Sequence, residues 1–224
     1  MKTSTRFLSV AALAIGTAST PAFADGDADS LSALSAQWWQ WAFSIPTNIN
    51  PLTDADGRHC MVGQRGPVWF LAGTWPGTGP TARTCTVPEG TALFFPILNS
   101  VWVNTPACDG SFTVAQLRAK AAFDIDGASG LSVLLDNRPV RSLRRIRSDV
   151  FATAFPQGDL FGSPPCLVAG QLYSPSVDDG YYVRLPGLSQ GTHHLSIRGT
   201  NTSGFAVDVF YTLNVVKVAT KERD

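Results

Sequence analysis

The stretch Phe205-Ala-Val-Asp-Val-Phe-Tyr-Thr-Leu-Asn-Val215 decides the fold. Its apolar side chains recur at every second position, between mostly smaller or polar residues, as in a strand with one buried face. The strand is expected to pair with residues 193–198 across the turn-rich segment 199–204, which indicates a hairpin. The alternating apolar positions are Phe205, Val207, Val209, Tyr211, Leu213 and Val215.

Two continuous apolar runs lie earlier in the chain, Pro67-Val-Trp-Phe-Leu-Ala72 and Thr91-Ala-Leu-Phe-Phe-Pro-Ile97. Segments rich in Gly and Pro bound them, which is typical of strands buried on both faces. Pro96 has no backbone N–H to donate, so it predicts a strand end or a bulge. The expected core residues of these runs are Trp69, Phe70, Phe94 and Phe95.

An N-terminal helix is expected over about residues 29–45, with Asp29 or Ser30 as N-cap and Pro46 ending it. Its wide apolar stripe includes three tryptophans within four positions, which form either core packing or a platform for stacking sugars. Core packing against a sheet is the commoner role of such a stripe. The stripe consists of Leu31, Leu34, Trp38, Trp39, Trp41, Phe43 and Ile45.

The middle of the chain mixes a short helix with strands. Thr113-Val-Ala-Gln116 matches a capping box and predicts a helix that stops before Asp126-Gly127. Residues 131–135 and 140–147 are expected to form a hairpin, and residues 156–178 a long connection. The sequence therefore predicts a mainly β fold, a β-sandwich of immunoglobulin-like or jelly-roll type with an N-terminal helix and one short inserted helix.

The N-terminus predicts export. Lys2 and Arg6 precede an apolar run over residues 7–15, and Ala22-Phe-Ala24 matches a cleavage site, so residues 1–24 are expected to be a signal peptide. Residues 25–224 are then expected to form a single domain, secreted or periplasmic. No later apolar stretch approaches the roughly 20 residues that a membrane helix needs.

The four cysteines all follow the expected signal peptide, where an even number indicates disulfides. The favoured pairing is Cys60–Cys85 with Cys108–Cys166, because each pair joins segments that the β pattern places near each other. A zinc site is the alternative, but no C-x-x-C spacing occurs.

The charge balance argues against a nucleic-acid partner. The chain has 17 basic and 17 acidic residues, and the signal carries two of the basic ones, so 15 stand against 17 in the mature part, a net of about −2. No cofactor is expected.

Several segments resemble a group of uncharacterised secreted bacterial proteins with an immunoglobulin-like C-terminal hairpin. They are Trp39-Gln-Trp41, residues 63–73, 83–90 and 179–186, and the final hairpin, which opens on Leu188-Ser-Gln-Gly-Thr-His-His-Leu195. The resemblance implies export and a bacterial origin, and it implies no mechanism.

Three residues are candidates for contact with a ligand. Trp75 lies in a loop of Gly, Pro and Thr, where a large indole serves either as a lid on the core or as a ligand contact. Arg145 and Arg147 share one face of a predicted strand, and guanidinium groups suit acidic polysaccharide or envelope phosphate. A solvated edge strand is the alternative. The surrounding cluster is Arg138, Arg141, Arg144, Arg145 and Arg147.

Catalytic and metal motifs are incomplete. Ser189 lies in a G-x-S-x-G match, but a nucleophile elbow needs a following helix, and a strand is expected there, so Ser189 is interpreted as a turn residue. His193 and His194 point to opposite faces of that strand and are not expected to share a metal. The pairs Asp54 and Asp56, Asp124 and Asp126, and Asp178 and Asp179 stand beside glycines as in calcium loops, but none completes a ligand set, and a turn is expected at each.

The sequence thus favours an exported, disulfide-stabilised and non-catalytic binding or envelope-associated protein, with carbohydrate or another surface ligand as its partner. The alternative is an extracellular hydrolase that acts on envelope or extracellular polymer.

Overall fold

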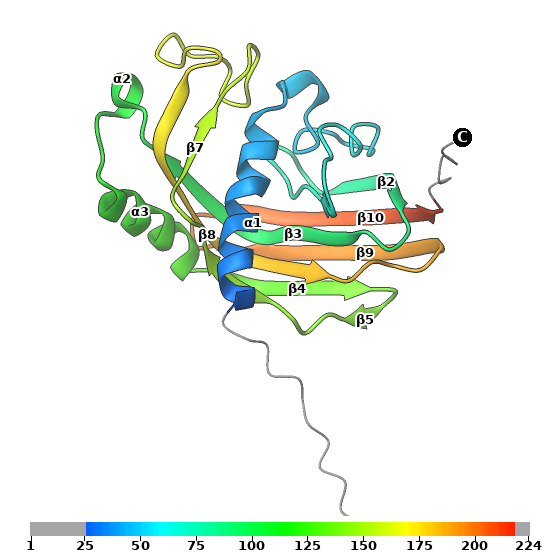
Figure 1. The fold of residues 1–224 in the computed structure, drawn as a ribbon. Helices are drawn as coiled ribbons and strands as arrows, with labels where there is room; N and C mark the ends of the chain where they lie inside the picture. Colours follow the sequence, from blue (N-terminus) through cyan, green and yellow to red (C-terminus); the bar gives the residue numbers. More distant parts are fainter. Residues whose placement is uncertain (1–25, 218–224) are drawn as a thin grey trace, which may run out of the picture.

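The computed structural model describes residues 26–217 of the chain, with side chains from Leu31 onward. The expected signal peptide, residues 1–24, lies outside this range. The described chain is mainly β, with two five-stranded sheets and few helices, as predicted (Figure 1). No helix in this range is long and apolar enough to cross a membrane.

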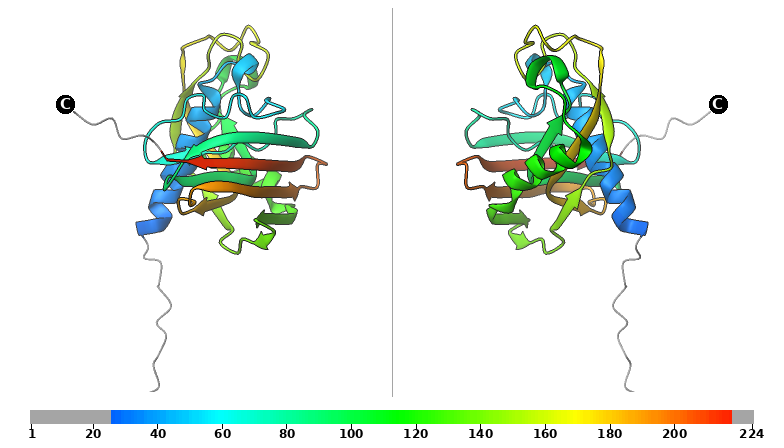
Figure 2. Two further views of the ribbon diagram at one scale, coloured as in Figure 1. Left: turned by 90° about the vertical axis from the view of Figure 1, so that its right-hand side faces the viewer. Right: turned by 90° about the vertical axis from the view of Figure 1, so that its left-hand side faces the viewer.

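Sheet B contains the strand that decides the fold. Its strands, in spatial order, are β2 (Thr81–Pro88), β10 (Ala206–Val216), β9 (Gly191–Thr200), β4 (Ser129–Leu135) and β5 (Arg138–Pro139). The left-hand view of Figure 2 shows β2, β10 and β9 side by side. The β9–β10 hairpin is confirmed, and Val207, Val209 and Tyr211 are buried while Phe210 is exposed.

Sheet A has the order β1-β3-β8-β6, and β7 also pairs with β8. Its strands are β1 (Val68–Phe70), β3 (Ala92–Val103), β8 (Leu172–Leu185), β6 (Arg144–Arg147) and β7 (Phe151–Ala154). A register shift between Pro96 and Leu98 confirms the expected bulge. Strand β1 pairs with β3 only at Ala92–Phe94. Beyond Phe94, the edge of β3 that faces away from β8 has no strand partner within the described chain.

The sheets and helices form layers. The two sheets enclose one core, which includes Phe95 and Tyr211, while α1 (Gly26–Phe43) packs on the other face of sheet A against Phe70 and Phe94. Helix α3 (Val114–Asp126) packs on β8 and β3. Figure 1 shows α1 crossing in front of β3 and α3 beside β8. The remaining helices are α2 (Pro106–Asp109) and the short 3-10 helix η1 (Thr47–Ile49).

Several local predictions are confirmed. Thr113 and Gln116 form the capping box of α3. The cysteines pair as Cys60–Cys85 and Cys108–Cys166, with no free cysteine in the described chain. The four expected core residues of the apolar runs, Trp69, Phe70, Phe94 and Phe95, are all buried.

Three predictions of element boundaries were wrong. Residues 156–178 are not one connection, because β8 begins at Leu172. The expected hairpin over residues 131–147 closes only at Arg138–Pro139, and Arg144–Arg147 crosses to sheet A as its edge strand. Helix α1 begins at Gly26, before either expected N-cap residue, and ends at Phe43.

Asp178-Asp179-Gly180 was also wrongly interpreted as a turn. It lies in the middle of β8, and both carboxylates are buried. Each carboxylate accepts side-chain hydrogen bonds, which offsets the cost of removing it from water. Asp178 lies on the α1 side of the sheet, with Trp39 and Tyr182, whereas Asp179 contacts Arg145 and Arg147.

Candidate functional site

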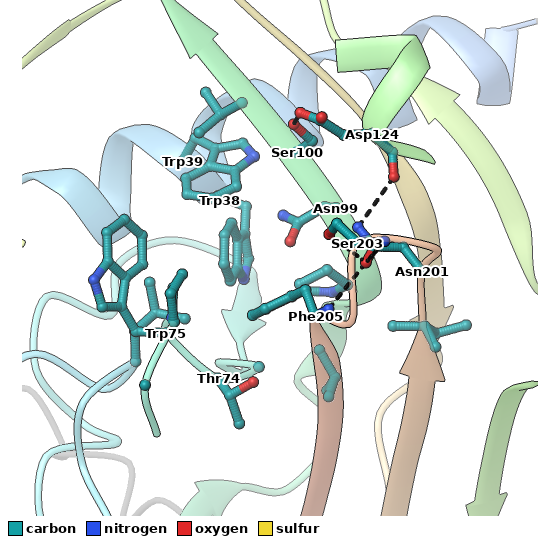
Figure 3. Close-up of a pocket in the computed structure, with 18 of the residues that line it drawn as sticks. Trp38, Trp39, Thr74, Trp75, Asn99, Ser100, Asp124, Asn201, Ser203 and Phe205 are labelled. Atoms are coloured by element: carbon teal, nitrogen blue, oxygen red, sulfur yellow. Dashed lines mark hydrogen bonds between the residues drawn. The ribbon is translucent and has the colours of Figure 1, made fainter. Parts of the chain in front are cut away.

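A cavity of about 560 Å³ lies beside the part of β3 that has no strand partner on that edge. Six segments of the chain line it: α1, the loop at Leu52, the loop 73–77, β3, the end of α3 and the turn before β10. Figure 3 shows three indoles on one side of this Trp75 pocket and polar side chains on the other. The residues labelled there are Trp38, Trp39, Thr74, Trp75, Asn99, Ser100, Asp124, Asn201, Ser203 and Phe205.

Trp75, the loop tryptophan singled out from the sequence, forms one wall of this pocket. It is half-buried, it packs partly on the core beneath α1, and its ring meets Phe161 edge-on with 5.4 Å between the ring centroids. Thr78 shapes the loop, since its hydroxyl donates to the Trp75 carbonyl and accepts from the Trp75 N–H. The side chain is therefore supported on one side and open to the pocket on the other.

Trp38 and Trp39 reach the pocket from α1 although both are buried in the core. The Trp38 indole N–H donates to the carbonyl of Leu71 at 3.0 Å, and that of Trp39 donates to Asp178 Oδ1 at 2.7 Å. Core packing of the tryptophan stripe is confirmed, and two of its members also contribute to the lining.

Asn99 stands on the polar side of the pocket and is held by a chain of hydrogen bonds. Its Nδ2 donates to Tyr182 Oη at 2.9 Å, and that hydroxyl donates to Asp178 Oδ2, also at 2.9 Å. Burial raises the pKa of the Asp178 carboxyl well above its ordinary value, and burial followed by the neighbouring Asp178 raises the pKa of Tyr182. These hydrogen bonds fix Asn99 and Trp39 relative to each other through the buried carboxyl group of Asp178.

Asp124 is the carboxylate of the polar side. Its Oδ2 accepts hydrogen bonds from Ser100 Oγ at 2.6 Å and from Trp102 Nε1 at 2.9 Å, and its backbone carbonyl accepts from Asn201 Nδ2 at 3.2 Å. Asp126, its partner in the possible calcium loop, binds Arg145 instead at 2.7 Å. Both belong to α3, which ends at Asp126, and the expected Asp-Gly turn follows there, since the Ala128 N–H donates to the Ile125 carbonyl.

Arg145 and Arg147 lie away from the Trp75 pocket, on edge strand β6. Arg145 binds Asp179 through two N–H groups, at 2.8 and 3.0 Å, and these bonds raise its pKa. Arg147 makes one longer contact with Asp179, at 3.4 Å. The predicted edge strand and the shared face of the two arginines are confirmed, and contact with a ligand stays a prediction for both.

The serine and histidine motifs lie at the start of β9. Ser189 precedes β9 without a following helix, and its carbonyl bonds with His193 Nε2 at 3.0 Å. His193 Nδ1 bonds with Asp136 at 2.8 Å, which raises the pKa of the histidine and lowers that of the aspartate. Within residues 26–217 no group of three or more His, Cys, Asp or Glu side chains is placed to hold a metal ion.

Comparison with known proteins places the chain in no family. No protein-family model matches it, and no curated protein matches it either. One solved structure, the solution structure of amebosin, aligns with 62% of this chain and 100% of its own at 12% identity, with a TM-score of 0.22. A similarity at that level supports no statement about fold or function.

Proposed function

We propose that this protein is an exported, non-catalytic carbohydrate-binding protein that holds its ligand in the Trp75 pocket. One observation carries the proposal. An indole projects from a loop of Gly and Pro into a cavity of about 560 Å³ whose other side carries Asn99 and Asp124.

The pocket matches both the apolar faces and the polar edge of a sugar ring. The C–H faces of a pyranose ring stack on an indole, and its hydroxyls need donors and acceptors at the ring edge. Asn99 and Asp124 supply an amide and a carboxylate opposite the indoles. Mostly apolar walls with a few placed polar groups are typical of small-molecule sites.

Export is supported by the two disulfides, because such bonds persist in oxidising compartments. A secreted or periplasmic protein meets carbohydrate in the cell envelope and in the medium. The expected signal peptide points to the same location.

The number of carboxylates in the pocket favours binding over hydrolysis. Most glycoside hydrolases use two Asp or Glu residues that flank the bond. Among the described residues that line the pocket, Asp124 is the one carboxylate. Asp178 is fully buried behind Trp39 and Tyr182.

The test is Trp75→Ala, measured by titration calorimetry against a panel of oligosaccharides of envelope and extracellular polymers. Loss of the stacking surface should weaken binding by about 1–3 kcal/mol, or roughly fivefold to 150-fold. The variant should stay folded, because Trp75 is only half-buried and its contact with Phe161 contributes about 1 kcal/mol beyond its packing on the core.

Phe123→Ala is the matched control, since Phe123 is 81% exposed on α3 and does not line the pocket. It should bind as the wild type does. Equal affinity of Trp75→Ala and wild type would contradict the proposed site. Release of new reducing ends by the wild-type protein would establish the hydrolase alternative instead.

A further inference from the structure

The Asp124 carboxylate has no cationic partner in the described chain. It is half-buried, and both of its side-chain hydrogen bonds come from neutral donors and reach the same oxygen, Oδ2. Lys120, one turn earlier on α3, lies over the rings of Trp102 and Phe112 and forms no ion pair with it. A partly desolvated charge without a counter-charge is unfavourable, so a cation in the pocket would gain from pairing with it.

The rest of the lining also favours positive charge. Indole faces attract cations through their quadrupoles, and the lining includes the half-buried Trp75 and the buried Trp38 and Trp39. Among the described residues of the lining, none is Lys, Arg or His. Asp124 would therefore repel a ligand carboxylate, and no cationic side chain of the described lining would offset that repulsion.

Asn99 adds an acceptor. Its Nδ2 donates to Tyr182 Oη, which donates its own proton to Asp178. The amide oxygen of Asn99 therefore remains to accept from a ligand. Together with Asp124 Oδ1, it makes this side of the pocket rich in acceptors.

We infer that the pocket selects a saccharide that carries an ammonium group, an amino sugar with a free amine. The ammonium pairs with Asp124, and the sugar ring stacks on Trp75. This inference rests on the proposed carbohydrate site and adds the charge of its ligand.

The test compares three oligomers of similar length by calorimetry, in mildly acidic buffer in which the sugar amines are charged. They are a β-1,4 glucosamine oligomer, its N-acetylated counterpart and an oligogalacturonate. The free-amine oligomer should bind about tenfold more tightly than the acetylated one, and the uronate most weakly. The advantage of the amine should shrink as salt is added.

Asp124→Asn should remove the preference for the amine while the neutral oligomer still binds, because an amide oxygen can still accept from Ser100 and Trp102. Asp126→Asn is the matched control, since Asp126 pairs with Arg145 outside the pocket. It should keep the preference.

The outcomes separate the two proposals. Equal or tighter binding of the acetylated oligomer or the uronate overturns the amino-sugar inference and leaves carbohydrate binding standing. Failure of all three oligomers and of the wider panel to bind overturns both.

Discussion

Asp178 is a carboxyl group whose titration departs from its ordinary behaviour in water. It is fully buried, and desolvation raises its pKa in the folded protein above that in the unfolded chain. The folded state therefore binds this proton more tightly than the unfolded state does. Its contribution favours folding in acid and is lost as the pH rises from the unfolded pKa towards the folded one.

Asp178→Asn should make the free energy of unfolding depend less on pH above about 4, the ordinary range of an Asp carboxyl. Urea unfolding of wild type and variant over a pH series measures this difference. Asp208→Asn, a change at an exposed pair with Arg198, is the control. Parallel pH profiles for wild type and Asp178→Asn would show that this carboxyl does not titrate differently in the two states.

At the residue level the sequence pointed to part of the site. Trp75 was a candidate because a large indole in a Gly/Pro loop lacks local apolar neighbours. Asn99 has no such signal, since a polar residue just after an apolar run does not reveal that it faces a cavity. Asp124 falls within the helix that the capping box predicts, but nothing in the local sequence shows that its side chain faces a cavity.

At the element scale, the two arginines of edge strand β6, Arg145 and Arg147, differ in how they bind Asp179 although the sequence pattern does not distinguish them. Arg145 makes two hydrogen bonds to Asp179, whose side chain is 3% exposed, while Arg147 is 67% exposed and makes one long contact. Arg145→Ala should destabilise the protein by about 3 kcal/mol, at the low end for breaking a buried pair because Arg145 is partly exposed. Arg147→Ala should cost under about 1 kcal/mol.

Denaturant unfolding of the two variants measures this contrast. A loss below about 1 kcal/mol for Arg145→Ala would mean that water solvates Asp179 once the guanidinium is gone. An equal loss for both variants would mean that the two arginines share the carboxylate evenly.

Whether a strand could be predicted from the sequence depends on which of its faces are buried and by what. Strand β10 was predictable because it has one buried face and alternates cleanly. Strand β8 was obscured because Asp178, Asp179 and Gly180 mimic a turn. Strand β2 carries a buried Arg83, whose guanidinium donates to the carbonyls of Asp54, Ala72 and Gly73 and to Tyr211 Oη. Such partners are distant in the chain and leave no local pattern.

On the scale of the whole molecule, the sandwich-like arrangement with an N-terminal helix was predictable from apolar periodicity. Its immunoglobulin-like or jelly-roll type stays a prediction. The pocket was not predictable, since it arises where β1 ends at Phe70, opposite Phe94, and six segments of the chain surround the open edge of β3. Convergence of this kind depends on strand order, which periodicity does not encode.

The most direct test of the central claim is a spectrum of the indole N–H groups of the six tryptophans during titration with the oligosaccharides. The Trp75 signal should shift most, with smaller shifts for Trp38 and Trp39, because these three line the pocket. Trp41 and Trp69 do not line it and should stay in place. An unmoved Trp75 signal under saturating ligand would contradict carbohydrate binding in this pocket.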